Sequence, residues 1–195
     1  MHRSFVIIVF VVSLLYSSAV FSVEDTNPSV NPAQQLFQER VGKVQWKNIS
    51  LEFRPVSDKA GRGLQSMVVQ SADQENGKTY FVGKSTILGL KDINNIDVTY
   101  NPTDVTMLRL LVLFNQDGKK TLQDYTTAHL NEMMGVVIDG KLRLVAHIRQ
   151  PLVNGMVQVY GLAPNEAVDI ARRYYQPKLE LARKINEELT AKAQK

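Results

Sequence analysis

The sequence predicts an α+β fold, in which a mostly antiparallel sheet of about five strands carries two helices packed on one face and a charged helix follows at the C-terminus. Short alternating or apolar segments, separated by turn residues, predict the strands. Two longer segments, starting near Asn115 and Pro164, place their apolar residues at helical spacing. Together these patterns indicate one folded domain with a tail at each end.

The N-terminus has the outline of a secretory signal. A basic start and an apolar run over residues 5–15 are followed by small residues up to Ser22. This order predicts a signal peptide over residues 1–22, cleaved after Ala19 or Ser22. The alternative is an uncleaved inner-membrane anchor, because residues 5–23 nearly reach the roughly 20 residues that span a membrane.

The composition excludes several kinds of site. Cysteine is absent, so neither disulfides nor thiolate metal ligands are available. The formal charge is only +4, and basic residues are interspersed with acidic ones, unlike the clustered basic face of a nucleic-acid binder. We therefore expect no nucleic-acid partner and a fold that is stabilised by its hydrophobic core.

The first third of the chain carries the weakest pattern. Residues 23–42 predict a flexible tether, because they contain two Asn-Pro pairs and few apolar side chains. Residues 44–53 then become strand-like, with every second residue apolar from Ile49 onward, and Pro55 ends the run. Residues 66–70 are a weak strand candidate between two polar loops.

The strand signal strengthens in the middle of the chain. Residues 80–93 contain two short extended pieces separated by Gly83 and a single helical turn at 91–93. Another alternating strand begins near Asn95. Residues 107–114 are almost wholly apolar, which predicts a central strand covered on both faces.

Two segments have helix signals. Asn115 is a favourable N-cap for a helix that extends to about Leu130. Pro164 suits the first turn of the second helix. Because Pro177 inside a helix costs on the order of 3 kcal/mol, we expect a break or kink near Gln176 and a second, charged tail helix over residues 177–195.

Residues 136–147 predict a complete β-hairpin. The apolar run 136–138 ends at Asp139 and Gly140, a pair that tolerates the positive φ of a tight two-residue turn. In the strand that follows, we expect the even-numbered residues 142–146 on one face and the odd-numbered residues on the other. Gly155 and Gly161 are further predicted turn positions, one on each side of a short strand.

The hairpin segment, residues 136–167, resembles the head of the first periplasmic domain of SecD, the accessory subunit of the bacterial Sec protein-translocation channel. The positions that match its pattern in register, without a gap, are Asp139, Gly140, Lys141, Ile148, Arg149, Pro151, Gly155, Gln158, Gly161, Glu166 and Ala167. Residues 80–84, 87–93 and 112–120 resemble further blocks of the family in the same order. The resemblance covers roughly residues 53–171 and implies a SecD-like head over residues 43–176.

What the resemblance implies about function is narrower than the activity of SecD. In SecD the head is thought to bind or hold the emerging preprotein while proton flow drives the membrane helices. This sequence contains no later transmembrane helices, so only polypeptide binding is carried over as an expectation. Ala146 replaces a proline of the family pattern, and Asn154 and Val157 replace glycines, which puts the flexibility of the neighbouring loop in question.

The sequence offers no catalytic, cofactor-binding or metal-binding constellation. His129 and His147 have no partner at a spacing that would form a metal site or a general base. The Gly83-Lys84-Ser85 run lacks the upstream glycine of a phosphate-binding loop, and no G-x-S-x-G elbow occurs. We therefore expect a protein that is not an enzyme and that needs no cofactor.

The loop after the hairpin is the candidate partner-binding site. It lies in the best-matched segment and presents an apolar Leu-Val pair between a proline and a glycine. The residues expected to contact a partner are Arg149, Leu152, Val153 and Asn154. Packing of the turn is the alternative explanation for these residues.

Two functional hypotheses follow. The first is an exported, periplasmic module that binds unfolded or extended polypeptide, with components of the Sec translocation machinery among its partners. The second is a structural or accessory subunit of another cell-envelope assembly that docks through its tail helix. Membrane association is expected only if the N-terminal segment stays uncleaved.

Overall fold

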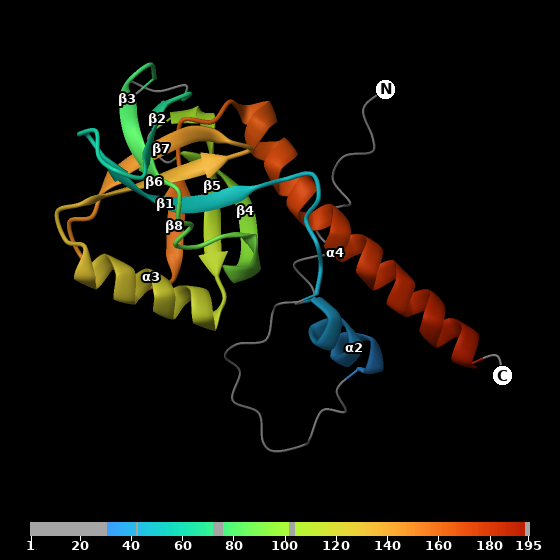
Figure 1. The fold of residues 1–195 in the computed structure, drawn as a ribbon. Helices are drawn as coiled ribbons and strands as arrows, with labels where there is room; N and C mark the ends of the chain where they lie inside the picture. Colours follow the sequence, from blue (N-terminus) through green and yellow to red (C-terminus); the bar gives the residue numbers. More distant parts are fainter. Residues whose placement is uncertain (1–30, 42, 72–75, 102–103, 194–195) are drawn as a thin grey trace. The chain divides into compact units, whose positions relative to one another are not determined.

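Eight strands form two antiparallel sheets in a computed structural model that describes residues 31–41, 43–71, 76–101 and 104–193 (Figure 1). The five-stranded sheet has the order β2-β3-β1-β6-β7, and the three-stranded sheet has the order β4-β5-β8. The strands are β1 (Leu51–Ser57), β2 (Leu64–Val68), β3 (Thr79–Gly83), β4 (Ile93–Asn101), β5 (Asp104–Phe114), β6 (Met133–Ile138), β7 (Lys141–His147) and β8 (Met156–Val159). The α+β class and the antiparallel five-stranded sheet are confirmed, and the second sheet is an addition to the single sheet expected.

The five-stranded sheet is centred on two strands that are far apart in sequence. Strand β1 pairs with β6 over most of its length, from Leu51 opposite Ile138 to Val56 opposite Met133. The ends of the sheet approach each other, because the N–H of Gln70 donates to the carbonyl of Leu142 at 2.8 Å. The two outer strands, β2 and β7, therefore meet at this point.

The predicted hairpin is present, but its second strand does not alternate as expected. Asp139 and Gly140 both have positive φ, 49° and 76°, between β6 and β7. A register shift pairs Val136 with Leu144 and Val137 with Leu142, which leaves Arg143 as the extra residue of a β-bulge. Leu142 and Leu144 consequently contribute to different hydrophobic clusters, and Arg143 is buried.

The main hydrophobic core lies between the two sheets and two helices. Helix α3 (Gln116–Ala128) begins as predicted at Asn115, whose Oδ1 accepts the N–H of Gly118 at 2.8 Å. Helix α4 (Pro164–Ala193) contributes its first apolar stripe to the same core, and a short 3₁₀ turn, η1 (Leu90–Asp92), precedes β4. The largest side chains buried in this core are those of Tyr174, Phe53, Leu51, Leu88, Ile96, Leu110, Leu122 and Leu162.

Helix α4 is continuous through Pro177, so the expected break does not occur, and the charged C-terminal helix is present as the second half of α4 (Figure 1). Pro177 has no N–H to donate to the carbonyl of Arg173, and its ring crowds the same turn. The indole Nε1 of Trp46 donates to the carbonyl of Tyr174 at 2.9 Å, and the two rings stack with centroids 5.7 Å apart. A residue ahead of β1 thus stabilises the helix at the turn that proline disturbs.

Residues 32–41, which the sequence assigned to a flexible tether, form helix α2 (Pro32–Val41). Proline fits the first helical position, and the following residues favour helix. Helix α2 packs on the second half of α4, where Arg40 pairs with Glu188 at 2.8 Å and Ile185 is only 1% exposed. Packing on a partner helix explains why this short, polar segment is ordered.

No helix in the described part of the chain is both long enough and apolar enough to cross a membrane. The predicted signal peptide over residues 1–22, the alternative anchor over residues 5–23 and the first part of the tether, residues 23–30, lie outside the described residues.

Candidate functional site

The loop predicted to contact a partner is fastened to the domain at several points. The N–H of Leu152 donates to Oγ1 of Thr126 in α3 at 2.9 Å, and Thr126 is fully buried. The Leu152 side chain is half-buried and packs against the main core. Leu152 therefore anchors the loop rather than presenting an exposed contact, which corrects the expectation of a freely exposed Leu-Val pair.

Three of the four predicted contact residues face solvent. Arg149 and Asn154 are exposed, and Val153 is 57% exposed. Oδ1 of Asn154 accepts the N–H of Met156 at 3.2 Å. Gly155 has a φ of 68°, and a side chain there would meet Lys119 of α3 at 2.9 Å. The exposed part of the loop is thus held directly at the start of β8.

Strand β8 leaves one edge of the three-stranded sheet open. It pairs with β5 from Leu110 opposite Val159 to Leu113 opposite Met156, and the N–H of Phe114 donates to the carbonyl of Gly155 at 2.9 Å. In an antiparallel ladder, every second residue directs its N–H and C=O groups to the same neighbouring strand. Gly155 bonds to β5, and Gln158 follows three residues later, so the N–H and C=O groups of Gln158 point away from β5. No described strand lies beyond β8.

The opposite edge of the same sheet is partly closed. The Tyr174 hydroxyl donates to the carbonyls of Ile93 and Asn94, and the Tyr175 hydroxyl donates to that of Ile96 at 3.1 Å. Nζ of Lys178 adds a bond to Asn94 at 2.9 Å. Side chains of α4 therefore occupy the acceptors at the start of the β4 edge, whereas the β8 edge has no such cover among the described helices.

Lys178, which bonds to the β4 edge, should make the stability of the domain depend on pH. Burial lowers the pKa of Lys178 from its ordinary value of 10.5 to about 8. Its Nζ has neutral partners, the Asn94 carbonyl and the Tyr174 hydroxyl, and lies 4.2 Å from the Tyr174 ring centroid. Because the unfolded chain binds this proton more tightly, the stability of the domain should rise as pH increases from about 8 to about 10.5.

Chemical denaturation of wild type and Lys178→Met at pH 7, 9 and 10 tests this expectation. The difference in unfolding free energy, wild type minus variant, should increase with pH, because only wild type contains the group. A difference that stays constant across the three pH values would show that Lys178 titrates normally.

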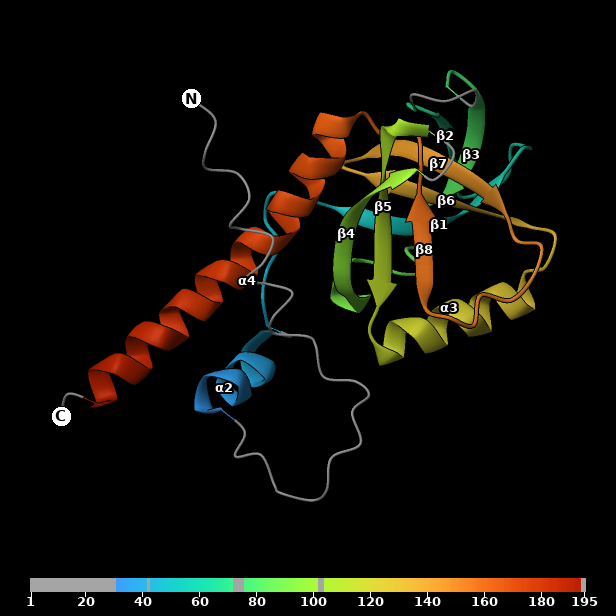
Figure 2. The same cartoon turned by 180° about the vertical axis from the view of Figure 1, so that it is seen from behind.

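The outer face of the three-stranded sheet is apolar at its centre. Leu110, Val112 and Val159 are buried in the main core, so the alternating residues Leu111, Leu113 and Met156 lie on the other face. These three side chains are partly exposed and belong to neither core cluster. Figure 2 shows this face, with α4 beside β4 and no helix across β5 and β8.

A polar cluster lies beside this apolar stripe. Nη1 of Arg109 donates to Oε1 of Gln158 at 2.8 Å and to the Tyr160 hydroxyl at 3.2 Å. The guanidinium carbon is 5.8 Å from the centroid of the Tyr160 ring, and the Tyr160 hydroxyl also bonds to Gln158. Arg109, Gln158 and Tyr160 thus form one connected group next to the open edge.

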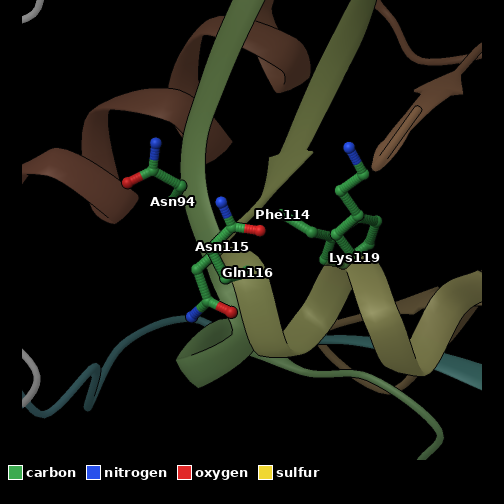
Figure 3. A pocket seen from close by; sticks show the side chains of 5 residues that line it. All are labelled: Asn94, Phe114, Asn115, Gln116 and Lys119. Carbon is green, nitrogen blue, oxygen red and sulfur yellow. The ribbon is translucent and has the colours of Figure 1, made fainter. Parts of the chain in front are cut away.

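The hollow at the start of α3 results from the capping of this helix and is not a second binding site. It has a volume of about 300 Å³ and is lined by Asn94, Phe114, Asn115, Gln116 and Lys119 (Figure 3). The polar atoms of Asn115 already cap the helix and donate to the carbonyl of Lys91 at 3.0 Å. Their involvement in the cap explains this arrangement without a ligand.

The two histidines have separate surroundings. His129 ends α3, stacks on Tyr125 with centroids 4.1 Å apart, and contacts Glu132 through Nδ1 at 3.0 Å. His147 is exposed at the end of β7, opposite Met133. Within the described ranges, no group of three or more His, Cys, Asp or Glu residues is arranged to hold a metal ion.

Comparison with known proteins gives a consistent result. The family model of the SecDF P1 head subdomain matches residues 66–173. The chain is 27% identical to the protein translocase subunit SecD of Magnetococcus marinus, over 62% of this chain and 25% of that protein. It therefore spans about a quarter of the length of that relative.

Two solved structures are similar in fold. One is SecDF in its super-membrane-facing form, with a TM-score of 0.52 and 18% identity over 74% of this chain and 21% of that chain. The other is SecDF described as a membrane component that enhances protein export, with a TM-score of 0.53 and 17% identity over 84% and 80% of the two chains. At these identities the similarity concerns the fold alone.

Proposed function

Because the chain belongs to the SecDF P1 head subdomain family, we propose that it is a non-catalytic module of protein export that binds extended polypeptide outside the cytoplasm. Components of the Sec translocation machinery are the partners that this family membership favours. The observation that carries the proposal is the open β8 edge, and the loop that leads into it carries the exposed side chain of Val153.

An extended segment would add to the sheet as a further strand. Such addition uses backbone hydrogen bonds for affinity and alternate side chains for contact with the sheet face. The backbone groups of Gln158 face the added strand, whereas the N–H of Met156 is already bonded to Asn154. The partly exposed Leu111, Leu113 and Met156 supply an apolar surface for every second side chain of the segment.

Docking of the tail helix on another subunit, the alternative function, has less support. The apolar stripe that would have mediated it includes Ile185, which helix α2 already helps to bury. A partner would have to displace α2, including the Arg40–Glu188 ion pair, to reach this stripe.

A binding titration with a labelled, permanently unfolded polypeptide tests the proposal, with fluorescence anisotropy as the readout. Val153→Asp should weaken binding by about tenfold, because a charge in the loop that leads into the edge opposes contact with apolar side chains. The matched control is Val168→Asp, since Val168 is 50% exposed on α4. Circular dichroism confirms that both variants fold. Absence of binding by wild type, or equal weakening in both variants, would refute the proposal.

A further inference from the structure

Arg109 differs from the other half-buried or buried arginines of the described chain in having no acidic partner. Each of the others pairs with at least one carboxylate within 4 Å. These pairs are Arg40 with Glu188, Arg54 with Glu52, Arg143 with Glu166, and Arg173 with Asp139 and Asp169. Arg109 instead contacts only the neutral Gln158 and Tyr160.

The missing partner has an energetic consequence. Removing a cation from water without a compensating charge is unfavourable, and a buried donor without an acceptor adds to that cost. Nε of Arg109 is the one buried side-chain nitrogen or oxygen in the described residues that has no hydrogen-bond partner. The carboxylate of Asp97, on the neighbouring strand, bonds instead to Asn95 at 2.9 Å.

The unused donor of Arg109 indicates an anion as the missing partner. Nη1 makes both hydrogen bonds of Arg109 and Nε is buried, so Nη2 is the guanidinium nitrogen left to meet a ligand. A charged N–H donor of this kind makes a strong, charge-assisted hydrogen bond to a carboxylate oxygen. Oε1 of Gln158 is occupied by Arg109 and Tyr160, so the amide can offer only further N–H donors.

Arg109, Gln158 and Tyr160 lie next to the proposed binding edge of β8. Gln158 and Tyr160 lie on the outer face with Arg109, and the backbone of Gln158 faces the strand that would be added. In such a pairing, the residue opposite Gln158 places its side chain on the same face, toward the cluster. The residue two positions away along the segment would approach the apolar side chain of Met156.

We propose that Arg109, Gln158 and Tyr160 form a carboxylate-binding subsite for an acidic side chain of the extended polypeptide bound along β8. The subsite selects segments in which a glutamate or aspartate stands two residues from an apolar residue. This inference rests on the proposed function, since the carboxylate is delivered by the bound segment.

Two peptides that differ at one position test the subsite. Both are labelled, extended sequences that alternate valine and serine, and one valine position carries either glutamate or glutamine, so that the changed residue stands two positions from a valine. Wild type should bind the glutamate peptide about tenfold more tightly, as expected for a charge-assisted hydrogen bond. Arg109→Gln should abolish this preference while leaving the affinity for the glutamine peptide within about twofold. Arg109→Lys, which keeps the charge but loses the fork, should retain only part of the preference.

The controls separate the possible failures. Arg183→Gln removes the same charge from an exposed position on α4 and should leave the preference intact. Equal binding of the two peptides by wild type would overturn the subsite while leaving the proposed function standing, whereas binding of neither would overturn both. Equal weakening of both peptides by Arg109→Gln would assign Arg109 a structural role only. Arg109-dependent binding of phosphatidylglycerol vesicles in place of the glutamate peptide would assign the site to a lipid headgroup and overturn the proposal.

Discussion

Replacing Tyr174 by alanine should lower the unfolding free energy of the domain by about 3–5 kcal/mol, the range typical of large aromatic truncations in a core. The side chain is 0% exposed and stacks on Trp46. Its hydroxyl donates to the carbonyls of Ile93 and Asn94 at 3.0 and 2.9 Å. The substitution therefore removes core volume and two links between α4 and the β4 edge at once.

Urea denaturation followed by circular dichroism measures this loss. Tyr174→Phe is the matched control, because it keeps the ring and removes only the hydroxyl, at an expected cost of about 1–2 kcal/mol. A loss below about 1 kcal/mol for the alanine variant would contradict the central position given to Tyr174.

Gly118→Ala should destabilise the domain by about 1–3 kcal/mol, although alanine favours helices by about 1 kcal/mol over glycine. A Cβ at this position would lie 2.5 Å from the carbonyl oxygen of Asp92 and 3.0 Å from its Cβ. The same carbonyl accepts the N–H of Asn115 at 2.9 Å, so it cannot move without disturbing the helix cap. The close approach of α3 to η1 therefore outweighs helix propensity.

Thermal unfolding of Gly118→Ala and Gly89→Ala provides the comparison. Gly89 has extended backbone with a φ of −141°, and a Cβ there would have only ordinary contacts at 3.7 and 3.8 Å. Only the Gly118 variant should melt at a clearly lower temperature. A Gly118 variant as stable as wild type would mean that the two elements separate easily.

The features that were predicted correctly from sequence depend on neighbouring residues. The Asp139-Gly140 turn requires positive φ at two adjacent positions, and the Asn115 cap requires one side-chain oxygen near the first helical turn. Both conditions can be recognised from a few consecutive residues of the sequence. The structure therefore agrees with the predicted starts of the hairpin turn and of α3.

The features that were missed depend on distant residues. Pro177 does not end α4, and the stabilising indole of Trp46 lies 128 residues away from the carbonyl it contacts. The division into two sheets depends on which strands pair, as with β1 and β6, and local alternation does not encode that choice. The bulge at Arg143 likewise appears only when the register of both strands is known.

The candidate site was predicted only in part. Val153 is exposed as expected, but Leu152 is bonded through its N–H to the buried Thr126 and packs against the core. Arg109 carried a usable signal, because it interrupts an otherwise apolar strand. Its significance depends on Gln158 and Tyr160, about 50 residues later, and on the absence of an ion pair to it in the described residues.

The unequal edges of the three-stranded sheet would also set the stoichiometry of the proposed binding. Side chains of α4 occupy acceptors along the start of β4, whereas the backbone groups of Gln158 in β8 face away from β5. A sheet that accepts a strand at one side holds one segment per domain, and each bound segment prevents a second from entering. Titrations should therefore saturate at one bound polypeptide segment per protein. A long unfolded chain, which contains many such segments, would bind several copies of the domain along its length.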